Sequence, residues 1–121
     1  MSFSFIASPY SHEDPDVMHS RYLTTMRFCA WAFDYRMVVY SPVVHWHQVS
    51  REFNLPTDAG NHYENSIEMI ESADDFMVLC IEGWQESRGV LKELLHAARL
   101  GKPIKWIKPL DNINWEIDNE L

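Results

Sequence analysis

Glu93 is the residue of this chain whose type and position most clearly suggest chemistry. It lies four residues after Gly89 and three after Val90, so both share its face in the helical segment 87–100. The side chain therefore lies beside an apolar stripe, which comprises Val90, Leu91, Leu94, Leu95 and Ala98. An isolated glutamate at such a boundary commonly packs its stem and sends its head group to water. Held away from water, the same carboxylate can act as a nucleophile or stabilise positive charge in a transition state.

Small polar, glycine and proline residues gather directly after three segments that we predict to be strands. The segments are residues 3–7, 37–40 and 76–81, and the last is apolar without alternation, as in a central parallel strand. The residues that follow are Ser8, Pro9, Tyr10 and Ser11, then Ser41, Pro42 and His45, then residues 82–89 with Gly83, Trp84, Ser87 and Gly89. The carboxyl ends of parallel strands share one edge of a sheet, and ligands bind in the crevice beyond it. We therefore predict that these residues surround one crevice.

Helical segments alternate with the strands, which predicts an α/β fold. The expected architecture is a three-layer α/β/α sandwich with a four- to five-stranded parallel sheet, of Rossmann or flavodoxin-like type. Asp14 followed by Pro15 predicts the start of a long first helix, and a short helix is predicted over residues 45–53. The predicted inner faces are Leu23, Met26, Ala30 and Phe33 in the first helix and Tyr63, Ile67 and Ile70 in a third helix, which follows a loop at 54–60.

The carboxyl-terminal third is predicted to complete the sheet. Ser87 caps a fourth helix that ends at Gly101, and residues 103–107 form the last strand. The tail 109–121 is acidic and rich in asparagine, and we expect it either to dock on a neighbouring subunit or to fray.

Length and composition indicate one globular domain over residues 1–121. Of these residues 46% are hydrophobic, which is enough for a single core. The chain lacks an apolar run of about 18 residues and the basic flank of a signal peptide, so we expect a cytoplasmic protein without a membrane partner. A net charge of -8 disfavours a nucleic-acid polymer as partner. Cys29 and Cys80 lie outside any CxxC motif or His/Cys cluster, and no GxGxxG turn follows the first strand, so neither a metal nor a cofactor is expected.

Five short motifs carry a resemblance to a known family. They are FIASPYS at 5–11, VYSP at 39–42, ADD at 73–75, Gly83-Trp84 followed by Ser87, Gly89 and Glu93, and GKP at 101–103. With these motifs in order, the chain resembles the nucleoside 2-deoxyribosyltransferase-like superfamily from residue 3 to about 107. The resemblance is strongest to small uncharacterised bacterial and phage members.

This resemblance implies chemistry at the N-glycosidic bond of a nucleoside or nucleoside 5'-monophosphate, by cleavage or by (deoxy)ribosyl transfer. Glu93 matches the glutamate nucleophile that attacks the anomeric carbon. Asp75, or Asp74 beside it, matches an aspartate that helps to handle the base. The family enzymes usually have a tyrosine in the first strand that hydrogen-bonds the nucleophile, and because Phe5 stands there, Tyr10 is the expected substitute.

The residues around the crevice are expected to bind the substrate. Ser87 stands where the family enzymes commonly carry aspartate, and with Gly89 it can present a helix start to a ribose hydroxyl or a 5'-phosphate. Arg21 is a weaker phosphate candidate, with a surface salt bridge as the alternative. His45 is expected at the sugar or base, and Trp84 either stacks on the base or closes the sheet edge. The full expected set is Ser8, Pro9, Ser11, Arg21, Ser41, His45, Gly83, Trp84, Ser87 and Gly89.

Two other functions fit the same crevice, namely a non-catalytic nucleotide-binding module and a glycohydrolase of NAD or a related dinucleotide. A homodimer or larger homo-oligomer is expected, because one thin sheet layer is unsuited to cover all the large apolar side chains. Those side chains are Trp31, Trp46, Trp106 and Trp115. A monomer whose tail folds back on its own helices is the alternative.

Overall fold

The computed structural model describes residues 2–57 and 59–121, with all of their side chains except those of residues 59–61. The strands and helices of this part of the chain follow the predicted order, with a short 3-10 helix at Trp84–Glu86 and a last strand at Trp115–Asp118 as additions that were not predicted. In order they are β1 (Ser4–Ala7), α1 (Pro15–Asp34), β2 (Val39–Tyr40), α2 (Pro42–Phe53), α3 (Ala59–Ser72), β3 (Asp75–Leu79), the short 3-10 helix η1 (Trp84–Glu86), α4 (Arg88–Arg99), β4 (Ile104–Pro109) and β5 (Trp115–Asp118).

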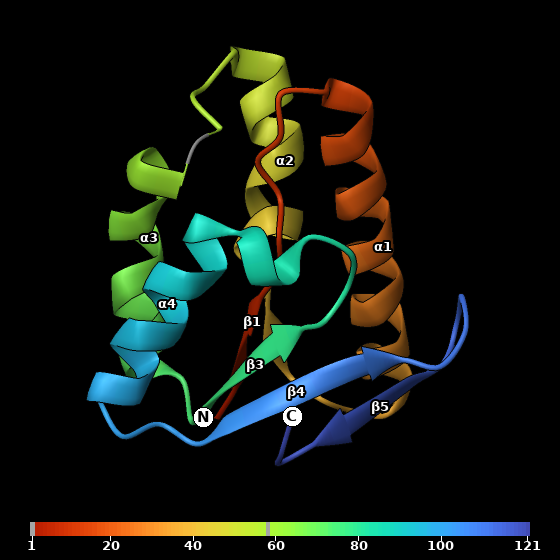
Figure 1. The fold of residues 1–121 in the computed structure, drawn as a ribbon, viewed down its shortest axis with the longest axis vertical. Helices are drawn as coiled ribbons and strands as arrows, with labels where there is room; N and C mark the ends of the chain where they lie inside the picture. Colours follow the sequence, from red (N-terminus) through yellow and green to blue (C-terminus); the bar gives the residue numbers. More distant parts are fainter. Residues whose placement is uncertain (1, 58) are drawn as a thin grey trace.

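The strands form one five-stranded sheet in the order β2-β1-β3-β4-β5 (Figure 1). The first four strands are parallel, and β5 pairs antiparallel with β4 at the edge. The predicted α/β class with a largely parallel sheet is therefore confirmed. The arrowheads of β1 and β3 in Figure 1 point toward the loops that precede α1 and α4, and this edge of the sheet carries the candidate site.

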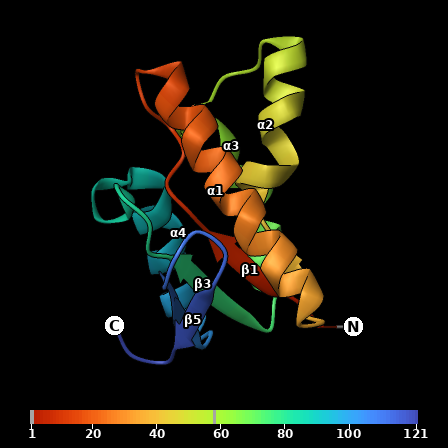
Figure 2. The same cartoon turned by 90° about the vertical axis from the view of Figure 1, so that its right-hand side faces the viewer.

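The sheet divides the hydrophobic core into two clusters, one on each face. Phe5, Ala7, Phe76 and Val78 face the side covered by α3 and α4. The intervening Ile6, Met77 and Leu79 face α1, which contributes Phe28 and Ala32. Figure 2 looks onto the α1 side of the molecule. Because side chains alternate along a strand, the face of every strand residue follows from its position in this register.

Side-chain caps explain where the helices begin. The Asp14 carboxylate accepts a hydrogen bond from the Asp16 amide, and Pro15 is the first helical residue, so α1 begins as predicted. Ser41 accepts from the Val44 amide with Pro42 as the first helical residue. Helix α2 therefore begins three residues earlier than predicted, because Ser-Pro forms a helix start here as well as a strand end. Of the predicted loop at 54–60, residue 58 lies outside the described residues, and α3 begins at Ala59.

The predicted inner face of α1 is wrong. Leu23, Met26 and Phe33 are exposed, Phe33 by 80%, as is Ala30. The helix instead buries Thr25, Phe28 and Ala32. Apolar residues occur on every side of α1, so their spacing permits several stripes, and the fit against the sheet selects one of them.

The prediction that the tail frays is wrong for residues 115–118, which pair with β4 of the same chain. Residues 115–118 form β5, and a turn in which the Asp111 carboxylate accepts from the Ile113 and Asn114 amides connects β4 to it. Trp115 is 5% exposed and packs edge-on against Phe28 with ring centroids 5.5 Å apart. The tail therefore belongs to this chain's own core. No helix in the described part of the chain is both long enough and apolar enough to cross a bilayer.

Candidate functional site

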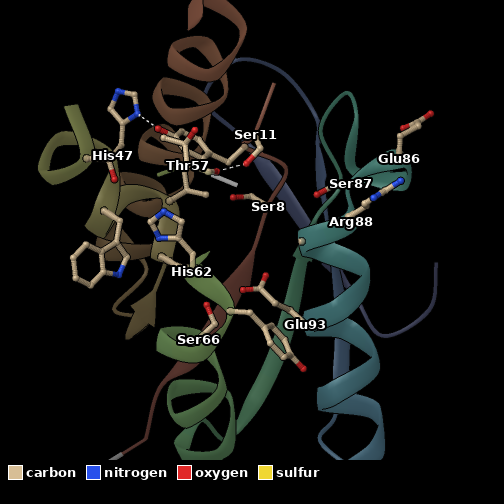
Figure 3. Close-up of a pocket in the computed structure, with 17 residues that line it drawn as sticks. Ser8, Ser11, His47, Thr57, His62, Ser66, Glu86, Ser87, Arg88 and Glu93 are labelled. Atoms are coloured by element: carbon tan, nitrogen blue, oxygen red, sulfur yellow. Dashed lines mark hydrogen bonds between the residues drawn. The ribbon is translucent and has the colours of Figure 1, made fainter. Parts of the chain in front are cut away.

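A cavity of about 400 Å³ lies beyond the carboxyl end of β1, between α2, α3 and the start of α4. Its volume is within the range of small-molecule sites. Four parts of the chain line it (Figure 3). They contribute Ser8, Tyr10 and Ser11 after β1; Pro42, Val43, Trp46, His47 and Ser50 from α2 with Thr57 after it; His62, Tyr63 and Ser66 from α3; and Glu86, Ser87, Arg88, Gly89 and Glu93 at and before α4.

Glu93 is the buried carboxyl group of this cavity. The buried stripe of α4 is Val90, Glu93 and Ala97, so Glu93 lies within the stripe and not beside it as predicted. Its side chain hydrogen-bonds with Ser66, which is itself 1% exposed on α3. Burial raises the pKa of Glu93 from its ordinary value of 4.5 to about 7, against the opposing effect of the Ser66 hydrogen bond. Near neutral pH both the protonated and the ionised form of this carboxyl group are therefore populated.

Tyr10 and His47 form a second polar group in another wall of the cavity, and His19 contacts this group from outside the cavity lining. The Tyr10 hydroxyl lies 2.7 Å from Nδ1 of His47, and Nε2 of His47 lies 3.4 Å from Nδ1 of His19. His47 is 3% exposed. Burial, followed by the charges of His19 and Arg51, lowers the pKa of His47, so this imidazole is neutral near pH 7.

Six of the predicted site residues meet at the cavity, namely Ser8, Tyr10, Ser11, Ser87, Gly89 and Glu93. Several of their hydroxyl groups already have partners. Ser11 Oγ donates to the Thr57 carbonyl, which ties the loop after β1 to the loop after α2. Ser87 Oγ accepts from the Val90 amide as the cap of α4. The serines thus shape the cavity as well as lining it.

Arg21 and Gly83 lie outside the cavity lining and form a brace between two crevice loops. Nη1 of Arg21 donates to the Ser11 carbonyl at 3.0 Å. Its guanidinium also lies over Gly83, where an added Cβ would meet Nη2 at 2.3 Å. Gly83 has φ of +93°, a conformation that favours glycine. Both residues therefore act on loop geometry, and the predicted phosphate contact of Arg21 is not part of this arrangement.

Four further predicted contacts also lie outside the cavity lining. Pro9 is buried, and Ser41 is buried as the cap of α2. His45 is exposed on the outer side of α2, because that helix begins at Pro42 and turns Val43, His47 and Ser50 inward. Trp84 packs against Trp106, with ring centroids 5.7 Å apart, and against the core cluster that faces α3 and α4.

Asp75 lies far from the cavity, at the opposite end of β3. It is the first residue of that strand and pairs with Ser4 of β1, whereas the cavity lies beyond the last residues of β1. Two residues before Met77, it also faces the α1 side of the sheet, where its carboxylate forms a 2.8 Å ion pair with Lys105. Asp74 is exposed beside it. The role in handling the base that the resemblance implied is therefore incompatible with the position of either aspartate.

Tyr10 lines the cavity as predicted, but its partner there is His47 and not Glu93. Phe5 is fully buried and stacks on Phe76. Burial raises the pKa of Tyr40 in β2 against the opposing effect of a hydrogen bond with Trp46, and the charge of Glu93 raises it further.

Ser66 and His47 were not among the predicted site residues. Ser66 is a polar residue on the predicted inner face of the third helix, between Tyr63 and Ile70. A polar residue on a predicted buried face is a sequence signal for a site residue. His47 shares a helical face with Val43 and Ser50, but the face is visible only if the helix starts at Pro42. Among the described residues, no group of three or more His, Cys, Asp or Glu side chains is placed to hold a metal ion.

Comparison with known proteins identifies a family without assigning a function. Residues 3–108 match the model of a family described as "Domain of unknown function (DUF1937)", and the chain belongs to that family. No curated protein matches the chain.

Proposed function

We propose that this member of the DUF1937 family cleaves the N-glycosidic bond of a nucleoside or nucleoside 5'-monophosphate, or transfers its (deoxy)ribosyl group, with Glu93 as nucleophile. The observation that carries the proposal is a carboxyl group buried in the wall of a ligand-sized cavity at the carboxyl edge of a parallel sheet. The resemblance of the sequence motifs to the nucleoside 2-deoxyribosyltransferase-like superfamily supports the same assignment.

Glu93 has no evident purpose as a packing residue. Its neighbours on the buried stripe, Val90 and Ala97, are apolar, and an apolar side chain at position 93 would avoid the cost of burying a carboxylate. Perturbed carboxyl groups in clefts are frequent at active sites. The loss of stability that results from burying this carboxyl group is thus consistent with selection for a chemical role.

The chemistry follows from the position of the carboxyl group. In the ionised state one Glu93 oxygen forms a bond to the anomeric carbon while the bond from that carbon to the base nitrogen breaks. The bonding electron pair leaves with the base, which takes up a proton. Water or a second base then attacks the anomeric carbon of the glycosyl ester, and the Glu93 carboxylate departs.

A screen of nucleosides, nucleoside monophosphates and NAD for released base tests the proposal. Glu93→Gln keeps the side-chain volume and removes the nucleophile, so it should abolish release while the protein stays folded. Glu68→Gln, on the exposed face of α3, is the matched control and should retain full activity. Wild-type release by the Glu93→Gln variant would exclude Glu93 as nucleophile.

We propose in addition that a 5'-phosphorylated ligand is preferred. The first turn of α4 presents Gly89 to the cavity, and Arg88 lines it beside Ser87. Calorimetric titration of a nucleoside and of its monophosphate compares the two ligands directly. Equal affinities would remove the phosphate contact from the proposal and leave the sugar and base contacts.

A non-catalytic nucleotide-binding module is the second candidate, and the position of Asp75 favours it. With that carboxylate at the far end of β3, one acid of the resembled enzymes is missing from the cavity. Calorimetric binding without base release from any compound in the screen would establish the binding function in place of the enzymatic one.

A further inference from the structure

We propose that Tyr10 and His47 supply the proton that the departing base requires, in the place of the missing aspartate. The inference rests on the proposed function, because it concerns the second half of the same bond cleavage. Figure 3 shows His47 on α2 and Glu93 on α4 on different walls of the cavity. A nucleophile on one side and a proton donor on another side is the arrangement that cleavage of a glycosidic bond needs.

The contacts form a continuous chain from the cavity toward α1. The Tyr10 hydroxyl contacts Nδ1 of His47 at 2.7 Å, and the other ring nitrogen of His47 contacts His19 at 3.4 Å. Tyr22 of α1 stacks on the His47 ring with centroids 3.9 Å apart and an interplanar angle of 18°, which holds the imidazole in place. A neutral imidazole donates through one nitrogen and accepts through the other, so the chain can pass a proton in either direction.

The electrostatic surroundings keep both members of the pair neutral. Burial lowers the pKa of His47, assisted by His19 and Arg51, while burial raises the pKa of Tyr10 against the smaller opposing effect of Arg51. A tyrosine that retains its proton and an imidazole that can replace it form a suitable acid for a weakly basic leaving group.

The other titratable residues of the cavity wall are less suited to this role. Glu86 and Arg88 are exposed at the rim. Nε2 of His62 contacts the carbonyl oxygen of Pro56 and must therefore carry its hydrogen toward that carbonyl. Tyr10 and His47, by contrast, are hydrogen-bonded directly to one another and can exchange a proton; His47 is buried and Tyr10 is half-buried.

The proposed step is balanced. As the anomeric carbon bonds to Glu93, the base nitrogen takes the Tyr10 proton, Tyr10 takes one from Nδ1 of His47, and Nε2 of His47 regains one from Nδ1 of His19. His19, which is partly exposed, takes a replacement proton from water at its other ring nitrogen. In hydrolysis, the water that attacks the glycosyl ester returns its proton through the same chain. The net reaction is nucleoside plus water giving free base and sugar.

Leaving-group dependence provides the test. The probes are the purine nucleosides released in the screen above and their N7-methylated forms, whose cationic base departs without needing a proton. Tyr10→Phe and His47→Asn should slow release from the unmethylated nucleoside by about 10²- to 10⁴-fold while leaving the N7-methylated form nearly unaffected. Tyr35→Phe removes the hydroxyl of an exposed tyrosine at the end of α1, outside the cavity lining and the chain of contacts, so it is the matched control and should behave as wild type.

The outcomes separate this inference from the proposed function. Thermal melting checks that each variant is folded, and Glu93→Gln should abolish release from both kinds of probe. If Tyr10→Phe and His47→Asn release unmethylated base at the wild-type rate, or slow both probes equally, the proton-donor role is refuted while Glu93 chemistry stands. If the wild-type protein releases no base from any probe, the proposed function fails and this inference fails with it.

Discussion

Replacement of Glu93 by glutamine should stabilise the protein, and increasingly so as the pH rises. The pKa of Glu93 is about 7 in the folded protein, against an ordinary value of 4.5. Between these values the folded chain retains a proton that the unfolded chain has released, so the contribution of this group to stability falls as the pH rises through that interval. Glutamine does not titrate, and its amide can still hydrogen-bond with Ser66.

The magnitude follows from the same interval. At about 1.4 kcal/mol for each pH unit, the difference between 4.5 and about 7 corresponds to a cost of about 3 kcal/mol in the free energy of unfolding at pH 8. Because the sequence pI is about 5.1, the protein has little net charge near pH 5 and associates more readily there, so the lower pH of the comparison is kept above the pI. Between pH 5.5 and pH 8 the stability gap between variant and wild type should widen by about 2 kcal/mol.

Urea unfolding followed by tryptophan fluorescence at the two pH values measures this gap. Glu68→Gln, on the exposed face of α3, should show a small and pH-independent difference from wild type. Parallel pH dependences of wild type and Glu93→Gln would refute the reasoning, since they would mean that Glu93 titrates alike in the folded and unfolded chains. A gap that widens while base release is lost would identify Glu93 as a residue retained at the expense of stability.

Four further predictions concern rate, loop geometry, the tail and assembly. Base release that needs ionised Glu93 should rise with pH through about 7, and a rate that is flat between pH 6 and 8 would argue against a carboxylate nucleophile. Gly83→Ala should destabilise the protein by roughly 1–3 kcal/mol more than Gly101→Ala in urea unfolding, because both glycines have positive φ but only Gly83 lacks room for a Cβ. Equal losses would show that the guanidinium above Gly83 moves away freely. Trp115→Ala should cost about 3–5 kcal/mol on thermal or urea unfolding because the ring is buried against α1; a loss below about 1 kcal/mol would mean that β5 is dispensable. We expect a homodimer or larger homo-oligomer by light scattering, with Phe33→Asp dissociating it, because the apolar stripe of α1 around that residue is exposed. A wild-type protein that is monomeric at micromolar concentration would exclude that assembly.

Local sequence patterns were sufficient for the order of the helices and strands as far as β4 and for several of their boundaries. Asp14-Pro15 and Ser87 each cap the helix that was predicted to follow them. Gly101, with φ of +73°, closes α4. Such signals are readable because each depends on hydrogen bonds between residues at most a few positions apart. In a parallel sheet the carboxyl ends of the strands lie at one edge, which is why the position of the crevice and the presence of Glu93 in it were predictable.

The pairing of distant residues was decided by the tertiary structure alone. Tyr10 meets His47 across 37 positions of the chain, and Arg21 reaches Gly83 only because two loops end at the same edge of the sheet. The position of Asp75 at the wrong end of β3 depends on the strand boundary and on the register with β1. A motif match places residue types in order, but it does not place them on one face or at one end of a strand.

The buried faces of the helices show the same limit. In α1 several apolar stripes were possible, and the one that packs against the sheet and Trp115 buries Phe28 and Ala32, which differ from the predicted residues. The spacing of apolar residues indicates that a helix has a buried face. The shape of the surface against which the helix packs determines which of its faces is buried. The sequence by itself therefore determined the fold class, the crevice and its carboxyl group. Only packing between segments far apart in the chain placed His47, Ser66 and Tyr10 in the same cavity as that carboxyl group.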